Sequence, residues 1–296
     1  MHNAPINLDH ISPARQHTAR LDAGERISLI YRDYWINYPD VNTIRGVVRA
    51  VYEMPPKVQA QCILVAAPPG MGKSSLFAKV QADLETLRKR HAEQKGYIAF
   101  SLAPDPTLGG FEECFSEALG VPIGRIRNGL VPDSFRRLVH LRKMRVVLID
   151  EVHNLLNANR TDQRKNLAFL RALSGPPLSL SIVAFGTSEA VNAVSSDEQL
   201  ERRFETYDLP RWKEDERFRS FLAGYESLLP LQRPSELWAQ DKVKYLLQST
   251  SGVTDAIVKR ITRGAVWAII EGKEKIDLSC LQKAINIPPY LDTFEE

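Results

Sequence analysis

The residues from Ala67 to Ser74, Ala-Pro-Pro-Gly-Met-Gly-Lys-Ser, have the types and spacing that bind a polyphosphate. They follow an apolar run, Cys62–Ala66, and precede a helical pattern that begins at Ser75. In such a strand, turn and helix, backbone N–H groups at the helix start point at the anion, and the helix dipole favours negative charge there. Lys73 can reach the terminal phosphates, and the Ser74 hydroxyl can bind Mg²⁺. We therefore expect a nucleoside triphosphate, with ATP and Mg²⁺ as the pair bound.

The loop departs from the usual pattern at its first position, where Ala67 replaces glycine. Alanine reaches only part of the backbone space that is open to glycine, so the loop must leave its strand with φ below zero. Gly70 and Gly72 remain for the close approach of the phosphates. The residues expected to contact the nucleotide are Pro68, Pro69, Gly70, Met71, Gly72, Lys73, Ser74 and Ser75 from this loop, with Asp150 from a later strand.

That later strand, Arg145–Ile149, ends in two acids, Asp150 and Glu151. Ligands bind beyond the carboxyl ends of the strands in open α/β sheets, so Asp150 is expected to share the Mg²⁺ with Ser74. Glu151 is placed to polarise an attacking water. The alternative is that Asp150 and Glu151 are acids at the point where a strand reaches solvent, without any function. The phosphate loop upstream favours a hydrolytic site.

His153 completes an Asp-Glu-Val-His string that resembles a helicase motif. Helicases of that type need two ATPase lobes, and this chain has one phosphate loop and one such strand. We therefore expect His153 to lie behind the acids or to face solvent.

A further apolar strand, Ser181–Phe185, ends in Gly186-Thr187-Ser188. Thr187 is expected to sense the γ-phosphate from between the acidic strand and the loop strand. Ser188 is the alternative, and a simple turn with a helix cap is the competing interpretation.

Two arginines, Arg202 and Arg203, precede the last strand of the pattern. A cation at this position can enter the site of a neighbouring subunit as an arginine finger, which stabilises charge on the transferred phosphoryl group. A solvated pair near a helix C-terminus is the alternative. The expected catalytic set is therefore Lys73, Glu151, Thr187, Arg202 and Arg203.

The elements that must hold these residues alternate along the chain. Strand-like runs are at Gln61–Ala66, Tyr97–Leu102, Arg145–Ile149, Ser179–Gly186 and Phe204–Leu209, with helical patterns between them. This alternation predicts an α/β fold with a parallel five-stranded sheet that is covered by helices on both faces. After Pro210 only helical patterns follow.

The predicted domains are an N-terminal arm with helices over 1–55, a nucleotide-binding core over 56–210, a helical lid over 211–286 and a tail over 287–296. The first 25 or so residues are expected to be extended or to order only on contact. The chain has 296 residues, a net charge of +3 and 44% hydrophobic residues, which is ordinary for a globular protein. No signal pattern or bilayer-length apolar stretch is evident, so a cytoplasmic protein without membrane contact is expected.

These parts, in this order, resemble the AAA+ class of P-loop NTPases over roughly Tyr34 to Ile285. More narrowly, the chain resembles the TniB/TnsC group, the ATP-dependent regulators of bacterial DNA transposition. The strings that carry the narrower likeness are Trp35–Pro39, Ile149–Leu156, Phe185–Thr187 and Gln199–Phe204. The resemblance implies ATP bound between subunits, rings or helical filaments on double-stranded DNA, and recruitment of a transposase, often with a TniQ-type adaptor.

The lid departs from the wider AAA+ pattern, because Gly252-Val253-Thr254-Asp255 has Asp255 where many members carry a phosphate-sensing arginine. This departure predicts slow hydrolysis and a switch more than a motor.

Contact with DNA would be made by basic side chains on phosphates, without sequence preference. The candidates are Arg125, Arg127, Arg136, Arg137, Arg142 and Lys143, with Lys259, Arg260 and Arg263 as a second patch. Ordinary solvated faces are the alternative for each residue. No aromatic stacking platform is evident, which argues against single-strand recognition.

Two other functions compete with the transposition regulator. A replication initiator or helicase loader of the AAA+ class would share the same core, but such proteins often add a winged-helix domain. A P-loop phosphotransferase for a small molecule would need neither an arginine at a subunit edge nor four helices after the sheet.

Overall fold

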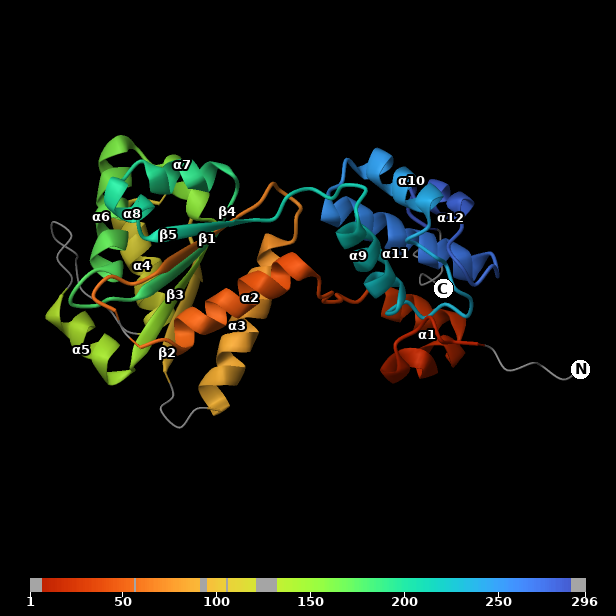
Figure 1. The fold of residues 1–296 in the computed structure, drawn as a ribbon, viewed down its shortest axis with the longest axis horizontal. Helices are drawn as coiled ribbons and strands as arrows, with labels where there is room; N and C mark the ends of the chain where they lie inside the picture. Colours follow the sequence, from red (N-terminus) through yellow and green to blue (C-terminus); the bar gives the residue numbers. More distant parts are fainter. Residues whose placement is uncertain (1–6, 56, 91–94, 105, 121–131, 289–296) are drawn as a thin grey trace, which may run out of the picture. The chain divides into compact units, whose positions relative to one another are not determined.

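A computed structural model describes residues 7–288 of the chain, apart from 56, 91–94, 105 and 121–131. The chain divides into two compact units, Asp40–Pro210, here the core unit, and Met1–Pro39 with Arg211–Glu296, here the helical unit (Figure 1). The N-terminal section 1–55 is thus divided between them. The predicted tail from 289 onward, and Arg125 and Arg127, lie outside the described residues.

The core unit is built on a sheet of five parallel strands, which confirms the predicted fold class. The strands are β1 (Cys62–Ala66), β2 (Gly96–Ser101), β3 (Met144–Asp150), β4 (Ser181–Gly186) and β5 (Phe204–Asp208). Their spatial order is β2-β3-β4-β1-β5, so β4 lies between the acidic strand and the strand that precedes the phosphate loop. The carboxyl ends of the strands therefore meet along one edge of the sheet.

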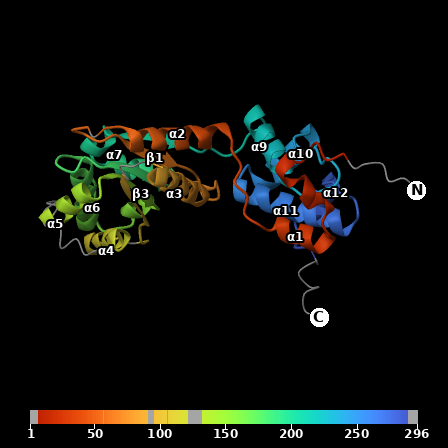
Figure 2. The same cartoon turned by 90° about the horizontal axis from the view of Figure 1, so that it is seen from below.

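Helices cover both faces of this sheet, which is why its central strands are almost continuously apolar. The helices are α2 (Pro39–Glu53), α3 (Lys73–Arg90), α4 (Leu108–Leu119), α5 (Asp133–Leu141), α6 (Arg160–Ser174), α7 (Glu189–Ser195) and α8 (Glu198–Glu201), with the 3-10 turn η2 (Val152–Leu156). Figures 1 and 2 show α4 and α6 against one face and α2 and α3 on the other side of the sheet.

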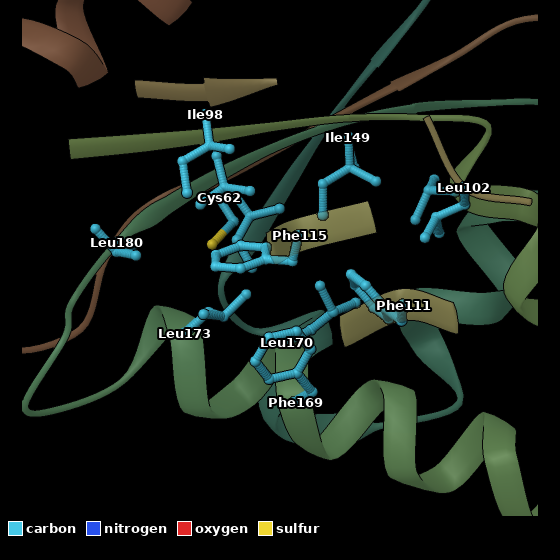
Figure 3. Close-up of a cluster of buried hydrophobic side chains, with 14 of the residues drawn as sticks. Cys62, Ile98, Leu102, Phe111, Phe115, Ile149, Phe169, Leu170, Leu173 and Leu180 are labelled. Atoms are coloured by element: carbon cyan, nitrogen blue, oxygen red, sulfur yellow. The ribbon is translucent and has the colours of Figure 1, made fainter. Parts of the chain in front are cut away.

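The α4 and α6 side of the sheet has an aromatic core (Figure 3). The ring of Phe169 lies 5.1 Å from that of Phe111 and 5.5 Å from that of Phe115, both in edge-to-face arrangements. Ile149 packs into this cluster one residue before Asp150. Burial of each such side chain contributes about 1.5–3 kcal/mol, so the end of β3 is held firmly in place.

The helical unit contains both ends of the described chain. Its elements are the 3-10 helix η1 (Pro13–Arg20), α1 (Ala23–Ile30), α9 (Glu216–Glu226), α10 (Gln240–Thr250), α11 (Thr254–Ile270) and α12 (Leu278–Lys283). The N-terminal arm, predicted to be extended or to order only on contact, is folded here in contact with the C-terminal helices. Ser12 N–H donates to Ser227 O at 2.9 Å, and buried Arg26 forms a two-pronged ion pair with Glu274 at 2.5 and 2.9 Å. The segment orders because its charges and apolar side chains find partners on the C-terminal helices.

The Trp35–Pro39 string also belongs to the helical unit. The ring of Tyr38 lies edge-on to Trp212 at 4.9 Å and to Phe221 at 5.9 Å. Trp212 is itself held by Gly252, where an added Cβ would lie 2.4 Å from Trp212 O. Tyr38 lies where the chain leaves the helical unit and Trp212 lies where it returns, and together with Phe221 they form one packed cluster.

Candidate nucleotide site

The phosphate loop connects the end of β1 to the first residue of α3. Gly70 and Gly72 have φ values of 77° and 84°, a left-handed conformation that glycine adopts at little cost. Ala67 is buried, does not share the positive φ, and donates its N–H to Gly186 O at 3.1 Å. The prediction that the loop leaves its strand with φ below zero is therefore confirmed.

Lys73 opens α3 with its side chain turned back onto the loop. The residue is only 8% exposed, and its Nζ donates to Ala67 O at 3.1 Å and Pro68 O at 3.5 Å. Ser74 and Ser75, the next two residues, are exposed on the first turn of the helix. The ammonium group and the helix start thus face the same small region, as an anion site requires.

Asp150 is the last residue of β3 and is buried, at 7% exposure. Burial raises the pKa of its carboxyl group, although a 2.8 Å hydrogen bond from Glu151 N–H and the positive charge of Lys73 act in the opposite direction. A carboxylate that burial penalises is stabilised when a cation binds beside it. Asp150 therefore fits a role as a metal ligand.

Glu151 has a left-handed backbone, with φ 56° and ψ 35°, which costs a non-glycine residue about 1–2 kcal/mol. The turn brings His153 back toward it, so that His153 Nδ1 lies 3.1 Å from Glu151 Oε2. The distance is that of an ion pair, and His153 Nδ1 has no hydrogen-bond partner among the described residues. The imidazole, whose side chain is 20% exposed, is thus mostly covered and contacts the carboxylate expected to polarise water.

Thr187 follows β4 directly, between β3 and β1. Its Oγ1 is buried and has no hydrogen-bond partner among the described residues. Ser188 is exposed, and its side chain makes no capping hydrogen bond to α7. Because a buried hydroxyl without a partner costs about 1–3 kcal/mol, the unpaired Thr187 oxygen fits a group that a ligand phosphate would satisfy.

The two arginines before β5 have different surroundings. Arg203 Nη1 donates to Ser174 Oγ at 2.8 Å and to Arg171 O at 3.2 Å, at the C-terminal end of α6. Arg202 is exposed, and within the described residues its guanidinium has no hydrogen-bond or ion-pair partner. Arg203 therefore caps a helix of its own unit, whereas Arg202 is free to reach outward.

The basic residues expected to touch DNA are dispersed on and after α5. Arg136 lies 3.5 Å from Asp133, and Arg142 donates to Leu119 O at 2.6 Å. Arg137 and Lys143 are exposed. Lys143 precedes the first residue of β3, so it lies at the opposite end of that strand from Asp150, beside a hollow of about 720 Å³.

Three asparagines after the acids were not singled out from the sequence. Asn154 and Asn157 donate to Leu102 O and Pro104 O, each at 3.1 Å, and Asn166 donates to Pro106 O at 2.7 Å. These bonds fasten the loop that follows β2 to η2 and α6. The signal was present as a cluster of Asn154, Asn157, Asn159 and Asn166, but nothing local indicates which carbonyl groups they reach.

The lid residues are also occupied locally. Asp255 pairs with Lys259 at 2.7 Å, and Thr254 Oγ1 accepts a hydrogen bond from Trp212 Nε1 at 2.9 Å.

No helix in the described part of the chain has the length and apolar character needed to cross a bilayer.

Known proteins resemble the chain in sequence pattern and in fold. A family model for the bacterial TniB protein matches residues 26–214. No curated protein matches the sequence. Three solved structures illustrate the shared fold. Drosophila ORC bound to DNA has a TM-score of 0.58 at 11% identity, over 99% of this chain and 71% of that chain. Aeropyrum pernix ORC2 in its ADPNP–ADP complexes has a TM-score of 0.59 at 13% identity, over 87% and 70%.

Cdc6p from Pyrobaculum aerophilum has a TM-score of 0.58 at 15% identity, over 87% of this chain and 69% of that chain. At such identities the likeness establishes the fold alone, which is that of a P-loop ATPase of the AAA+ class. In this chain the phosphate loop follows β1 and the acid pair ends β3, so both lie at the carboxyl edge of the sheet.

Proposed function

The chain belongs to the TniB family and is an AAA+ ATPase, and from that premise we propose that it is an ATP-dependent regulator of DNA transposition. In this proposal it assembles on double-stranded DNA, as a ring or a helical filament, with ATP bound between subunits. The assembly recruits or activates a transposase at target DNA, with a TniQ-type adaptor as a further partner. One observation supports the proposal most strongly. A hydrolytic set lies at one sheet edge, while Arg202 beside β5 is exposed and has no acceptor among the described residues.

Each residue of the nucleotide site has its own role in binding or hydrolysis. Backbone N–H groups of the loop Pro68–Ser75 surround the phosphates, and Lys73 stabilises their negative charge. Ser74 and Asp150 would hold Mg²⁺, which neutralises charge on the β- and γ-phosphates when it is bound. Glu151 orients and polarises the attacking water, and the free Thr187 hydroxyl donates to a γ-phosphate oxygen.

Arg202 supplies the remaining charge from a neighbouring subunit. Because its side chain is exposed and Arg203 is fastened to the end of α6, we assign the finger role to Arg202. Hydrolysis then requires two subunits in contact. ATP favours assembly, and its hydrolysis releases the subunits again.

A second candidate is a replication initiator or helicase loader of the same class. The likeness to ORC and Cdc6p structures favours it, although those proteins share at most 15% identity with this chain. The two candidates differ in their partner, since one delivers DNA to a transposase and the other delivers a helicase. A small-molecule phosphotransferase is less well supported, because the fold is that of the AAA+ class.

The decisive experiment is sedimentation velocity, with electron microscopy, of the full chain with duplex DNA and a slowly hydrolysed ATP analogue. We expect large assemblies that need both ligands. Lys73→Ala should lose nucleotide binding and assembly. Lys79→Ala is the matched control on the same helix, where Lys79 lies 3.8 Å from Asp83, and it should retain both.

Only monomers of the unaltered chain under these conditions would refute the proposal. Co-sedimentation with a transposase, compared with a replicative helicase, then separates the two candidates. Helicase retention without transposase retention would favour the second.

A further inference from the structure

The N-terminal half of α6 presents a basic surface that the nucleotide site does not use. Arg160 and Arg164 are exposed and one helical turn apart, and the described residues give neither guanidinium an acceptor. Lys165 is exposed beside them, 3.9 Å from Asp162 Oδ1, at the limit of an ion pair. This group is here called the α6 basic surface.

The start of α6 is already satisfied by its own chain. Asn159 Oδ1 accepts from the N–H groups of Thr161 and Asp162 at 3.1 and 3.0 Å, and Asn159 Nδ2 donates to Asp162 at 2.7 Å. A partner must therefore be held by the arginine side chains. Guanidinium groups bind phosphates in two-pronged, charge-assisted pairs, and residues one turn apart are about 5–6 Å apart at Cβ, close enough to contact separate phosphates of one strand.

The kind of partner follows from what the surface contains. Residues 157–165 include no aromatic side chain on which an unpaired base could stack. Single-strand binders rely on such stacking, whereas contacts to duplex phosphates need only cations. The α6 basic surface therefore fits the backbone of double-stranded DNA.

Its position differs from that of the basic residues near α5. Lys143 precedes β3, while α6 follows β3 through η2, so the two surfaces flank opposite ends of a seven-residue strand. At about 3.3 Å per residue, those ends are about 20 Å apart. The α6 basic surface is at the end that carries Asp150 and Glu151.

Hydrogen bonds connect this surface to the acids. Asn154 and Asn157 of the η2 region fasten to the loop after β2, and Asn166 of α6 fastens to the same loop. Leu102 of that loop donates its N–H to Asp150 O at 3.0 Å. These bonds give a continuous connection from the start of α6, through the described residues of the loop, to the end of β3, where Glu151 follows Asp150.

We propose that Arg160, Arg164 and Lys165 bind the phosphate backbone of duplex DNA and that this contact sets the position of Glu151, which couples DNA binding to ATP hydrolysis. The proposal rests on the proposed function, since it assigns the DNA contact and its regulatory effect. It replaces Arg136, Arg137 and Lys143 as the main contact.

The first test measures duplex binding of the full chain against salt concentration, with a slow ATP analogue present. Arg160→Glu with Arg164→Glu removes two phosphate contacts, so the slope of log K against log salt should fall by about 2. Arg137→Glu with Lys143→Glu makes the same charge change at the other surface and should leave the slope unaltered. Circular dichroism and nucleotide affinity check that each variant folds.

The reverse pattern, with the slope reduced by the Arg137 and Lys143 variant alone, would overturn the assignment and return the contact to the α5 region. Failure of the unaltered chain to bind duplex DNA at any salt concentration would instead refute the proposed function. The two failures are therefore distinguishable.

The second test addresses the coupling. Asn157→Ala removes the bond to Pro104 O from an exposed position and should retain the DNA affinity of the unaltered chain. We expect the stimulation of ATP turnover by DNA to fall severalfold in this variant. Stimulation equal to that of the unaltered chain would show that contact and catalysis are not linked through η2.

Discussion

Two buried carboxylates, one in each unit, have opposite surroundings. Asp150 in the core unit accepts a hydrogen bond from Glu151 N–H, and burial raises the pKa of its carboxyl group. Glu226 in the helical unit accepts three, from the N–H groups of Ser235, Glu236 and Leu237, at 2.6, 2.9 and 2.8 Å. The first carboxylate is held ready for a ligand, whereas the second is a structural bridge between α9 and the following loop.

The same difference extends to their neighbours. At the nucleotide edge, Thr187 Oγ1 is buried without a partner and Glu151 has a strained backbone, so folding leaves one polar group unsatisfied and one residue under strain there. In the helical unit, buried Arg26 is neutralised by Glu274. Unpaired groups at one edge of a well-packed fold mark where binding energy is to be gained, and substitutions there should change activity more than stability.

The largest expected difference is between replacement of Arg202, which should lower ATP turnover, and replacement of Arg203, which should lower stability. Arg202→Ala should lower ATP turnover in assembled protein by about 10³-fold or more, since a finger in trans has that weight, and should leave unfolding unchanged. Arg203→Ala removes the donor to Ser174 and Arg171 O and should lower the free energy of unfolding by about 1–2 kcal/mol. The measurements are ATP turnover and thermal unfolding of both variants. Equal losses of turnover with equal stability would show that the two arginines do not have different roles.

Glu151→Gln tests the nucleotide edge itself. Loss of the group that polarises water should slow hydrolysis by about 10²–10⁴-fold, while ATP binding and assembly persist. Single-turnover hydrolysis and analogue binding are the measurements. Unchanged turnover would remove Glu151 from its role.

Glu226→Ala tests the helical unit. Three N–H groups, of which those of Ser235 and Leu237 are buried, lose their acceptor, so the free energy of unfolding should fall by about 3 kcal/mol. All four tryptophans, Trp35, Trp212, Trp238 and Trp267, belong to this unit, so tryptophan fluorescence in denaturant follows its unfolding specifically. Glu216→Ala, at an exposed position of the same helix, should change stability by less than about 0.5 kcal/mol. Comparable losses in both variants would contradict the bridging role.

Thr187→Val should slightly raise stability, whereas Glu226→Ala lowers it. Because the hydroxyl has no partner, its replacement by a methyl group should stabilise the unliganded protein by about 1 kcal/mol and yet reduce ATP turnover. Thermal melts without nucleotide, beside turnover assays, give both quantities. A destabilised variant would mean that the hydroxyl supports the fold.

Asp150→Asn should have the smallest effect on stability, and this effect should depend on pH. Since the pKa of Asp150 in the folded chain is raised, its ionised form destabilises the fold at neutral pH, and protonation relieves this as pH falls toward the ordinary value of 3.8. The variant should therefore melt above the unaltered chain at pH 7, with a margin that narrows as the solution is acidified. A margin independent of pH would exclude the carboxyl group as its source.

The order of elements could be predicted because each depends on neighbours in sequence. The run Cys62–Ala66, the glycines after it and the acids at the end of β3 carry their own periodicity and turn chemistry. The part that could not be predicted depends on contacts across the fold. Nothing near Arg203 indicates that Ser174 lies beside it, and the His153 contact depends on the φ of 56° at Glu151, which no spacing reveals.

The η1–α1 segment illustrates the same limit. The polar composition of the first 25 or so residues predicts an arm that is extended or orders only on contact, but it does not show that Ser12 N–H finds Ser227 O in the C-terminal part of the chain. Local signals such as the Asp22 cap on Glu25 N–H at 2.8 Å were present, yet they do not identify the surface on which the segment lies.

The division of the helical unit between the two ends of the chain has a consequence for biosynthesis. Residues 40–210 can fold as soon as they leave the ribosome, whereas α1 must wait for α9–α12, which are made last. During that interval the apolar side chains of Ile27 and Ile30, buried in the finished protein, have no surface to cover them. Released fragments that end at residue 210 should therefore bind chaperones through their first 39 residues, although their ATPase core can already form.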